Sequence, residues 1–232
     1  MNGRIPRLGA VIFDMDGLVI DSERTYVTAW RHAARDAGVV MGDAFFEGLF
    51  GCQREDVTRL IAERLGASPF DPERFFMAAK DHWFKAIEAQ GIQRMPGIEA
   101  LLEVLQRRGL PYALATNSEA RYADICLRHA GLLEAFPVRV TRDQVAAGKP
   151  APDLFLEAAM RLGVSASVAL VLEDSDTGLL AARAAGACPV LIQGRPDRFK
   201  AFAPQADRAF PSLEHFTAAL LDHQEAQIFH SD

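Results

Sequence analysis

Short apolar runs that end in polar residues recur along this chain and constrain its fold more than any other feature. Each run is continuous rather than alternating, as expected for a strand of a parallel sheet that is buried on both faces. The candidates are residues 8–13, 111–115, 168–172 and 189–192, with a weaker one at 137–140. Segments of helical period lie between them, at residues 98–108, 120–129, 153–162 and 177–185, each with a glycine at or just after its end.

This alternation of strand and helix predicts an α/β fold. Right-handed crossovers would arrange the strands in a doubly wound, mostly parallel sheet of the Rossmann-like kind. In such sheets the ligands lie beyond the carboxyl ends of the strands. We therefore look for functional residues directly after each apolar run.

The residues from about 22 to 91 break this rhythm, because they have a helical pattern throughout. The candidate helices there are residues 23–37, 44–49, 54–65 and 72–89. We therefore expect an α/β core formed by residues 1–18 and 95–232, and an inserted helical cap domain at residues 19–94. The two crossings, near residues 17–21 and 91–97, are natural hinges for a lid.

Composition narrows the class of function. Half of the 232 residues are apolar, so the chain can bury a sizeable core, and the formal charge of −6 comes without a basic stripe for nucleic acid or anionic lipid. No apolar stretch approaches the roughly 18 residues of a membrane span. Cys52, Cys126 and Cys188 are scattered singly, which fits reduced thiols in a cytoplasm. We expect a soluble cytoplasmic protein, a monomer by default, with a small-molecule substrate.

Acidic and polar residues follow several of the predicted strands. Asp14 and Asp16 come after the first, Thr116 and Asn117 after the second, and Glu173 with Asp174 after a later one. Carboxylates gathered at one rim repel one another unless a cation lies between them or a proton is shared among them. Oxygen ligands of this kind suit Mg²⁺, which commonly shares its coordination with a substrate phosphate. The sequence therefore predicts a magnesium and phosphate site.

Chemical roles can be assigned to these residues. One carboxylate of the Asp14 and Asp16 pair can attack phosphorus while the other handles protons. The Thr116 hydroxyl and the main-chain amides around Asn117 would cradle phosphate oxygens, and Lys149 would offset their charge. Simpler interpretations stay open for each: Asp174 and Thr116 as cap or turn residues, and Lys149 as a solvated loop lysine.

Four segments together resemble the motifs of the haloacid dehalogenase superfamily: VIFDMDGLVIDSE, ALATNS, GKPAPD and LVLEDSDTG. The place of the helical insert resembles the subgroup that contains β-phosphoglucomutase and sugar-phosphate phosphatases. The resemblance implies that Asp14 is nucleophile and metal ligand, and that Asp16 is the acid/base with its main-chain carbonyl on the metal. It further implies that Asp174 is a metal ligand with Glu173 close by, that Thr116 binds the phosphoryl group, and that Lys149 steadies it.

Within this superfamily we expect a Mg²⁺-dependent phosphatase that hydrolyses a small phosphorylated metabolite, such as a sugar phosphate, through an aspartyl phosphate. A sugar-phosphate mutase is the alternative, because Arg54 lies in a segment similar to the one with which β-phosphoglucomutase holds its second phosphate. Tyr26 departs from the mutase pattern. Dehalogenation is a distant alternative, because the resemblance implies that dehalogenases lack the residue equivalent to Asp16. A non-catalytic binding module is equally distant, since Asp14, Asp16, Lys149 and Asp174 all match.

Overall fold

The computed structural model describes residues 8–39, 41–49, 54–65 and 71–222. The chain divides into two compact units, one made of Met1–Ile20 with Arg94–Asp232 and the other of Asp21–Gln93. We describe each unit by itself. None of the helices in the described ranges combines the length and the hydropathy that a membrane span requires.

The first unit is built on a six-stranded sheet whose order is β3-β2-β1-β4-β5-β6. Each strand pairs with its neighbours in parallel, which confirms the predicted doubly wound α/β fold. The strands are β1 (Ala10–Phe13), β2 (Tyr112–Ala115), β3 (Arg139–Val140), β4 (Ala169–Glu173), β5 (Cys188–Ile192) and β6 (Arg208–Phe210).

Strand register places the functional residues at one edge of this sheet. Phe13 at the end of β1 pairs with Leu114 of β2 on one side and with Leu172 of β4 on the other. The next residue, Asp14, continues the ladder, since its N–H donates to the carbonyl of Leu172 at 3.0 Å. The segments that follow β1, β2 and β4 therefore leave the sheet together.

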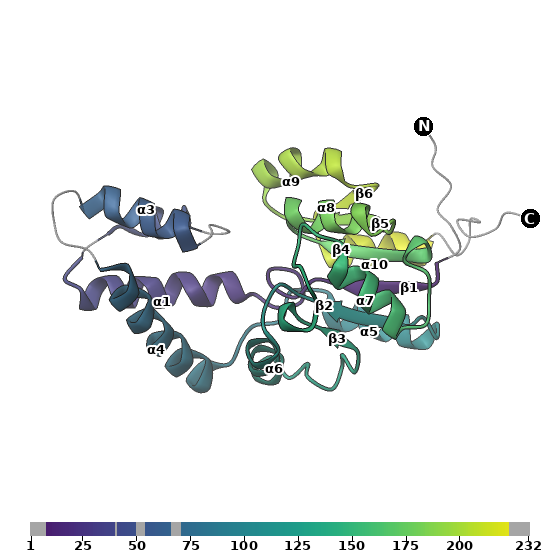
Figure 1. The fold of residues 1–232 in the computed structure, drawn as a ribbon, viewed down its shortest axis with the longest axis horizontal. Helices are drawn as coiled ribbons and strands as arrows, with labels where there is room; N and C mark the ends of the chain where they lie inside the picture. The colour runs from purple at the N-terminus through teal and green to yellow at the C-terminus, as the bar shows by residue number, and fades with distance from the viewer. Residues whose placement is uncertain (1–7, 40, 50–53, 66–70, 223–232) are drawn as a thin grey trace, which may run out of the picture. The chain divides into compact units, whose positions relative to one another are not determined.

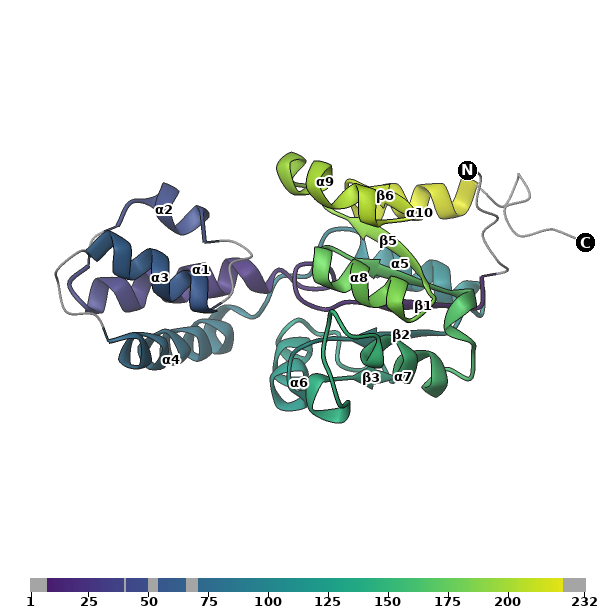
Figure 2. The same cartoon turned by 45° about the horizontal axis from the view of Figure 1, so that its top comes forward.

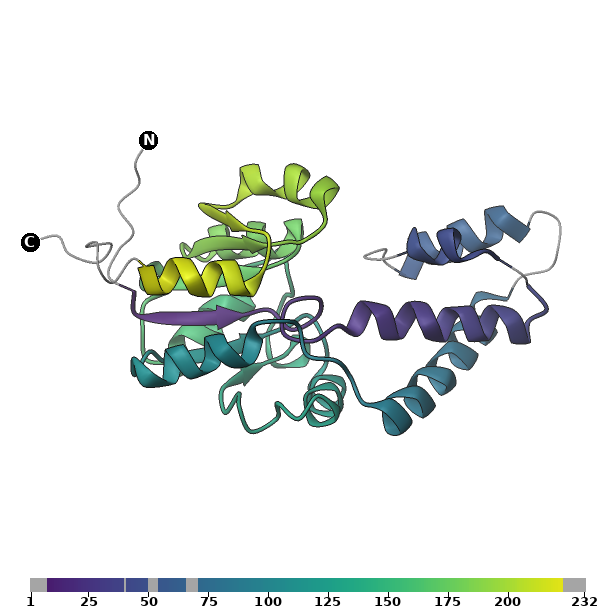
Figure 3. The same cartoon turned by 180° about the vertical axis from the view of Figure 1, so that it is seen from behind.

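Helices cover both faces of the sheet. In Figures 1 and 2, α7 (Asp153–Arg161) and α8 (Asp176–Ala184) lie on the near face, and Figure 3 shows α5 (Ile98–Arg107) and α10 (Leu213–Asp222) on the opposite one. The core on the α7 and α8 side contains Ala10 and Ile12. Side chains alternate along a strand, so Val11 and Phe13 face the α5 and α10 side. Every residue of β1 is consequently buried.

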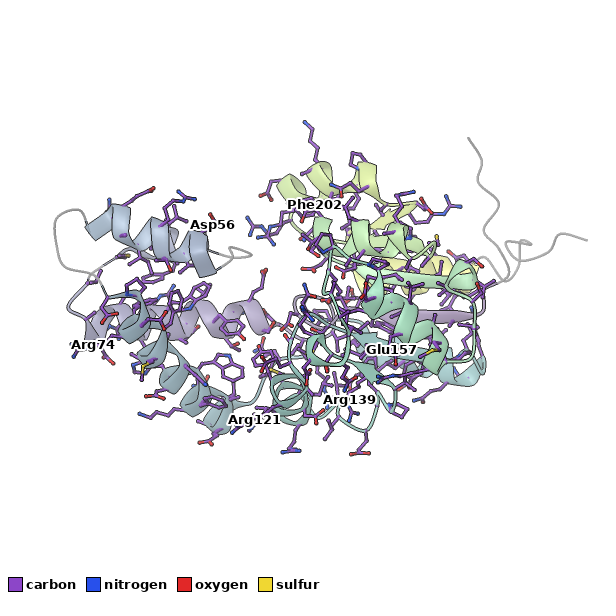
Figure 4. The ribbon with its side chains drawn as sticks, in the orientation of Figure 1. Asp56, Arg74, Arg121, Arg139, Glu157 and Phe202 are labelled. Atoms are coloured by element: carbon purple, nitrogen blue, oxygen red, sulfur yellow. The ribbon has the colours of Figure 1, made fainter. Side chains whose placement is uncertain are left out.

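The remaining helical segments of this unit connect the strands. They are α6 (Ala120–His129), α9 (Pro196–Phe202) and the short 3₁₀ segments Arg142–Gln144, Ala166–Val168 and Ala203–Gln205. Gly109 and Gly163 follow α5 and α7 with φ of 61° and 71°, a left-handed conformation that favours glycine and ends each helix where the sequence predicts. Arg161 ties α7 to β3, because its guanidinium donates to the carbonyl of Arg139 at 2.7 Å. Within α7 the same side chain bonds to the carboxylate of Glu157 at 2.7 Å. Figure 4 labels Arg139 and Glu157.

The last elements of the sheet unit, α9, β6 and α10, were not predicted from the sequence. The three-residue edge strand β6 is only partly buried, so it lacks the continuous apolar run by which the inner strands are detected. Elsewhere the observed helix and strand limits coincide with the predicted ones or differ by at most two residues, as element ends commonly do.

In its described residues the second unit has four helices: α1 (Ser22–Asp36), α2 (Asp43–Glu47), α3 (Arg54–Leu65) and α4 (Pro72–Gln90). Asp21 and Asp71 cap α1 and α4 by accepting the N–H of the residue three positions on, Arg24 and Arg74. Figure 4 labels Arg74 and also Asp56, which pairs on α3 with Arg59 at 3.0 Å. The α3 helix begins and ends where the sequence predicts.

An aromatic cluster joins α1 to α4 inside the second unit. The Trp83 ring is buried, and its indole N–H donates to the Thr25 hydroxyl at 2.9 Å. The ring of Tyr26 stacks on Trp83 with centroids 5.7 Å apart and also lies against Trp30. The described contacts of Tyr26 thus include packing within this unit, which is a structural use for the residue that departs from the mutase pattern.

Candidate active site

A buried lysine lies between two carboxylates at the carboxyl edge of the sheet. Lys149 Nζ donates to Asp14 Oδ1 in a short hydrogen bond and to Glu173 Oε1 at 2.6 Å. Its side chain is 3% exposed, that of Glu173 is 0% exposed, and the ammonium also lies 4.9 Å from the centroid of the Phe155 ring. The interpretation of Lys149 as a solvated loop residue is therefore wrong.

Burial and charge act against each other in this group. Burial raises the pKa of Asp14, as does the nearby Asp16, while Lys149 lowers it, and the net direction is upward. The pKa of Glu173 is raised for the same first reason, burial. Burial lowers the pKa of Lys149, but the charges and hydrogen bonds of Asp14 and Glu173 outweigh it and raise that pKa. Lys149 is consequently a permanent cation at neutral pH.

Three carboxylates at this edge are close enough to hold one cation. Oxygen atoms of Asp14, Glu173 and Asp174 all lie within 4.8 Å of one another. The turn after β1 makes room for this approach: Gly17 has φ of 81°, and a Cβ there would lie 2.5 Å from Asp174 Oδ2. Oxygen donors of this kind fit Mg²⁺, so the residues present suit the metal that the sequence predicts.

Asp16 and Asp14 have different hydrogen-bond partners. Its Oδ2 accepts hydrogen bonds from the hydroxyls of Ser118 at 3.0 Å and Thr116 at 3.4 Å, whereas Asp14 contacts Lys149. The chain turns directly after Asp16, where the N–H of Gly17 donates to the carbonyl of Ile20 at 2.9 Å. Ser118 was missed as a site residue, although its place two residues after Thr116 was a usable signal.

The residues after β2 contact both Asp16 and Lys149. The Thr116 hydroxyl accepts the N–H of Ser118 at 3.0 Å, which shapes the turn. The side chain of Asn117 bonds to the main chain of Lys149 through both of its polar atoms. Its predicted phosphate-binding group is the main-chain amide, and that role stays a prediction.

The start of α8 serves both the helix and the site. Ser175 is the N-cap of α8, accepting the N–H of Gly178 at 3.1 Å, and its hydroxyl donates to Glu173 Oε2 at 2.9 Å. A Cβ at Gly178 would lie 1.9 Å from the Glu173 carboxyl group, so only glycine leaves room for that side chain. The N-cap of α8 is therefore Ser175 and not Asp174, while Glu173 and Asp174 belong to the acidic group at the sheet edge.

Two further residues bear on the site: Gln193, which was not predicted, and Arg54, which was. Gln193, after β5, donates from Nε2 to the carbonyl of Asp174 at 3.0 Å and supports that segment, a contact that sequence reasoning did not find. Arg54, the predicted cap ligand of the substrate, is the first residue of α3, and its side chain lies outside the described part of the chain, as does Cys52.

Comparisons with known proteins identify the family of this chain. A family model described as haloacid dehalogenase-like hydrolase matches residues 11–192. Fructose-1-phosphate phosphatase YqaB of Escherichia coli is 34% identical over 180 residues, covering 78% of this chain and 94% of the relative. β-Phosphoglucomutase of Bacillus subtilis is 31% identical over 193 residues, covering 81% of this chain and 84% of the relative. The crystal structure of a HAD family hydrolase from Deinococcus radiodurans with bound phosphate and sodium has a TM-score of 0.79 and 30% identity, covering 97% of this chain and 99% of that one.

The parallel six-stranded sheet with an acidic cluster at its carboxyl edge defines this protein as a Rossmann-like α/β protein. The chain belongs to the haloacid dehalogenase-like hydrolase family, in the group that resembles β-phosphoglucomutase, and it is an enzyme of the phosphatase type. The family resemblance predicted from the motifs is confirmed.

Proposed function

We propose that this chain is a Mg²⁺-dependent phosphatase that hydrolyses a small phosphorylated metabolite, such as a sugar phosphate, through an aspartyl phosphate on Asp14. The observation that carries the proposal is the buried Lys149 ammonium held by Asp14 and Glu173, beside a third carboxylate. A phosphate ester brings negative charge, and this group offers a fixed cation and a carboxylate nucleophile at one point.

Mg²⁺ would be held by Asp14, by Asp174 and by the main-chain carbonyl of Asp16, with Glu173 nearby, and would neutralise charge on the phosphate when bound. Side chains of the protein would bind and orient the phosphoryl group. Lys149 keeps one Asp14 oxygen in place and offers positive charge to the phosphoryl oxygens, and the Thr116 hydroxyl binds one of them.

The reaction has two displacements. Asp14 attacks phosphorus, the bond to the leaving oxygen breaks, and Asp16 gives its proton to that oxygen. Asp16 then takes a proton from a water molecule, which attacks the aspartyl phosphate and releases inorganic phosphate together with free Asp14. The different hydrogen-bond partners of Asp14 and Asp16 support this division of labour.

The helical unit is proposed as a cap domain that confers substrate selectivity, with Arg54 as a ligand of an anionic substrate. The sugar-phosphate substrate class is supported by the phosphatase and mutase relatives described above.

The scattered cysteines favour a cytoplasmic site of action. Mutase activity remains the second candidate because of the identity to the Bacillus subtilis enzyme.

The deciding experiment measures inorganic phosphate release from a panel of phosphorylated sugars, nucleotides and small acids, with Mg²⁺ and with EDTA. β-Glucose 1-phosphate is included, and its isomerisation is followed in parallel. Asp14→Asn should abolish release, while Asp176→Asn, an equal charge change outside the three-carboxylate group, should keep it. Isomerisation with little release would establish the mutase instead, and an inactive wild-type protein would refute the enzyme proposal.

A further inference from the structure

We propose that Asn117 is a positioning residue that holds the main chain of Lys149, rather than a side-chain ligand of the phosphoryl group. The effect on catalysis rests on the proposed function, because it acts through the Lys149 ammonium. The hydrogen bonds themselves are independent of that function.

The carboxamide of Asn117 binds one residue twice. Its Oδ1 accepts the N–H of Lys149 at 2.8 Å, and its Nδ2 donates to the carbonyl of Lys149 at 3.3 Å. The two residues are 32 positions apart, so this pairing joins the loop after β2 to the loop before α7. The oxygen and one N–H of the carboxamide are thus engaged with the main chain of Lys149, and these two bonds fix its orientation.

Close packing at Gly148 supports the same assignment. A Cβ at Gly148 would lie 2.4 Å from Asn117 Oδ1 and 2.7 Å from Arg142 Cδ. Arg142 in turn donates to the carbonyls of Val145 at 3.0 Å and Ala146 at 3.4 Å. The peptide before Lys149 is thus enclosed by Asn117 and Arg142, and glycine is required there because a larger residue would displace the carboxamide.

Lys149 is consequently held at both ends. Its ammonium is bound by Asp14 and Glu173, and its main chain is bound by Asn117. If the main chain shifts, the ammonium must leave its place beside Asp14 or the side chain must change rotamer. Displacements on the order of 1 Å in a reacting group lower rates strongly, so a residue outside the reacting atoms can matter here.

The first test measures the protection of the Lys149 N–H by the Asn117 side chain and needs no activity assay. Hydrogen exchange of the Lys149 amide is measured by NMR in the wild-type protein, in Asn117→Ala and in Gly148→Ala. Both variants should exchange this amide about tenfold faster, as expected for loss of a hydrogen bond. Glu119→Ala, at an exposed residue two positions from Asn117, is the matched control and should leave the rate unchanged. An unchanged Lys149 rate in Asn117→Ala would overturn the proposal.

The second test is a double-mutant cycle on hydrolysis of an aryl phosphate with Mg²⁺. Asn117→Ala should lower kcat about tenfold in the wild-type background. In a Lys149→Met background it should lower kcat by less than about twofold, because its effect passes through Lys149. Losses that multiply would mean that Asn117 contacts the substrate itself and would refute the proposal. If the wild-type protein hydrolyses nothing while the exchange result is as expected, the proposed function has failed and the Asn117 contact stands.

Discussion

The hydroxyl of Ser118 donates a 3.0 Å hydrogen bond to Asp16 Oδ2, across 102 residues of sequence. This bond fixes the carboxylate that we propose as the acid/base on the β2 side of the site. Ser118→Ala should lower kcat about tenfold to a hundredfold, because a hydrogen bond to a charged group contributes about 1.5 to 3 kcal/mol. Ser118→Thr keeps a hydroxyl and should retain most activity. Equal kcat values for Ser118→Ala and wild type in steady-state assays would show that this hydrogen bond does not contribute to catalysis.

Removal of the buried lysine should damage both stability and activity. Lys149→Met leaves Asp14 and Glu173 buried together without their cation, so unfolding free energy should fall by about 3 to 5 kcal/mol. Activity should fall by at least about a hundredfold. Urea unfolding at pH 7 measures the first effect. Adding Glu173→Gln should recover part of the stability and none of the activity; a double variant less stable than Lys149→Met would contradict the argument from unpaired charge.

Mg²⁺ should stabilise the folded protein through Asp174. At a free concentration about one hundred times Kd, binding adds about 2.7 kcal/mol to the free energy of unfolding. Thermal unfolding with and without Mg²⁺ should therefore show a shift in Tm for the wild type and little shift for Asp174→Asn. Without Mg²⁺ this variant should be the more stable protein, because one of three crowded carboxylates has lost its charge. Asp176→Asn serves as the control with an unchanged shift.

Asp143 should give a pH-dependent contribution to stability. Its Oδ1 accepts the Thr141 hydroxyl at 2.7 Å and the Ala120 N–H at 2.9 Å, and these bonds hold the pKa of Asp143 below its ordinary value of 3.8. A lowered pKa means that the contribution is present above 3.8 and is lost as pH falls through the folded-state value. Asp143→Asn should thus be less stable than wild type at pH 7, with the difference shrinking as the solution is acidified. Urea titrations across this range measure it, and a constant difference would refute the linkage.

Gly178→Ala should displace the Glu173 side chain in the acidic site. The added methyl group would meet the Glu173 carboxyl group at 1.9 Å, so that side chain or the start of α8 must move. We expect a stability loss of about 1 to 3 kcal/mol, typical of overpacking, together with reduced phosphate release. Gly42→Ala is the matched control, because a Cβ there meets nothing within 4 Å. Wild-type activity in Gly178→Ala would show that the Glu173 position is not critical.

Much of the fold and part of the site follow from local sequence. The inner strands are continuous apolar runs and their helices have amphipathic period, so β1, β2, β4 and β5 were predicted nearly at their limits. Asp14, Glu173 and Asp174 were recognisable because they directly follow such runs. A parallel sheet brings its carboxyl ends to one edge, and this geometric rule alone predicts that these carboxylates meet.

Tertiary structure decided which side chains pair at that edge. The bonds from Ser118 to Asp16, from Asn117 to Lys149 and from Gln193 to Asp174 join segments that no local pattern relates. They depend on strand register and on the close approach permitted at Gly17, Gly148 and Gly178, which arises only in the folded chain. Sequence by itself determined the kind of fold and the chemical groups at its functional edge. The packed chain determined their partners, because hydrogen bonds of about 3 Å are set by the three-dimensional packing of the main chain.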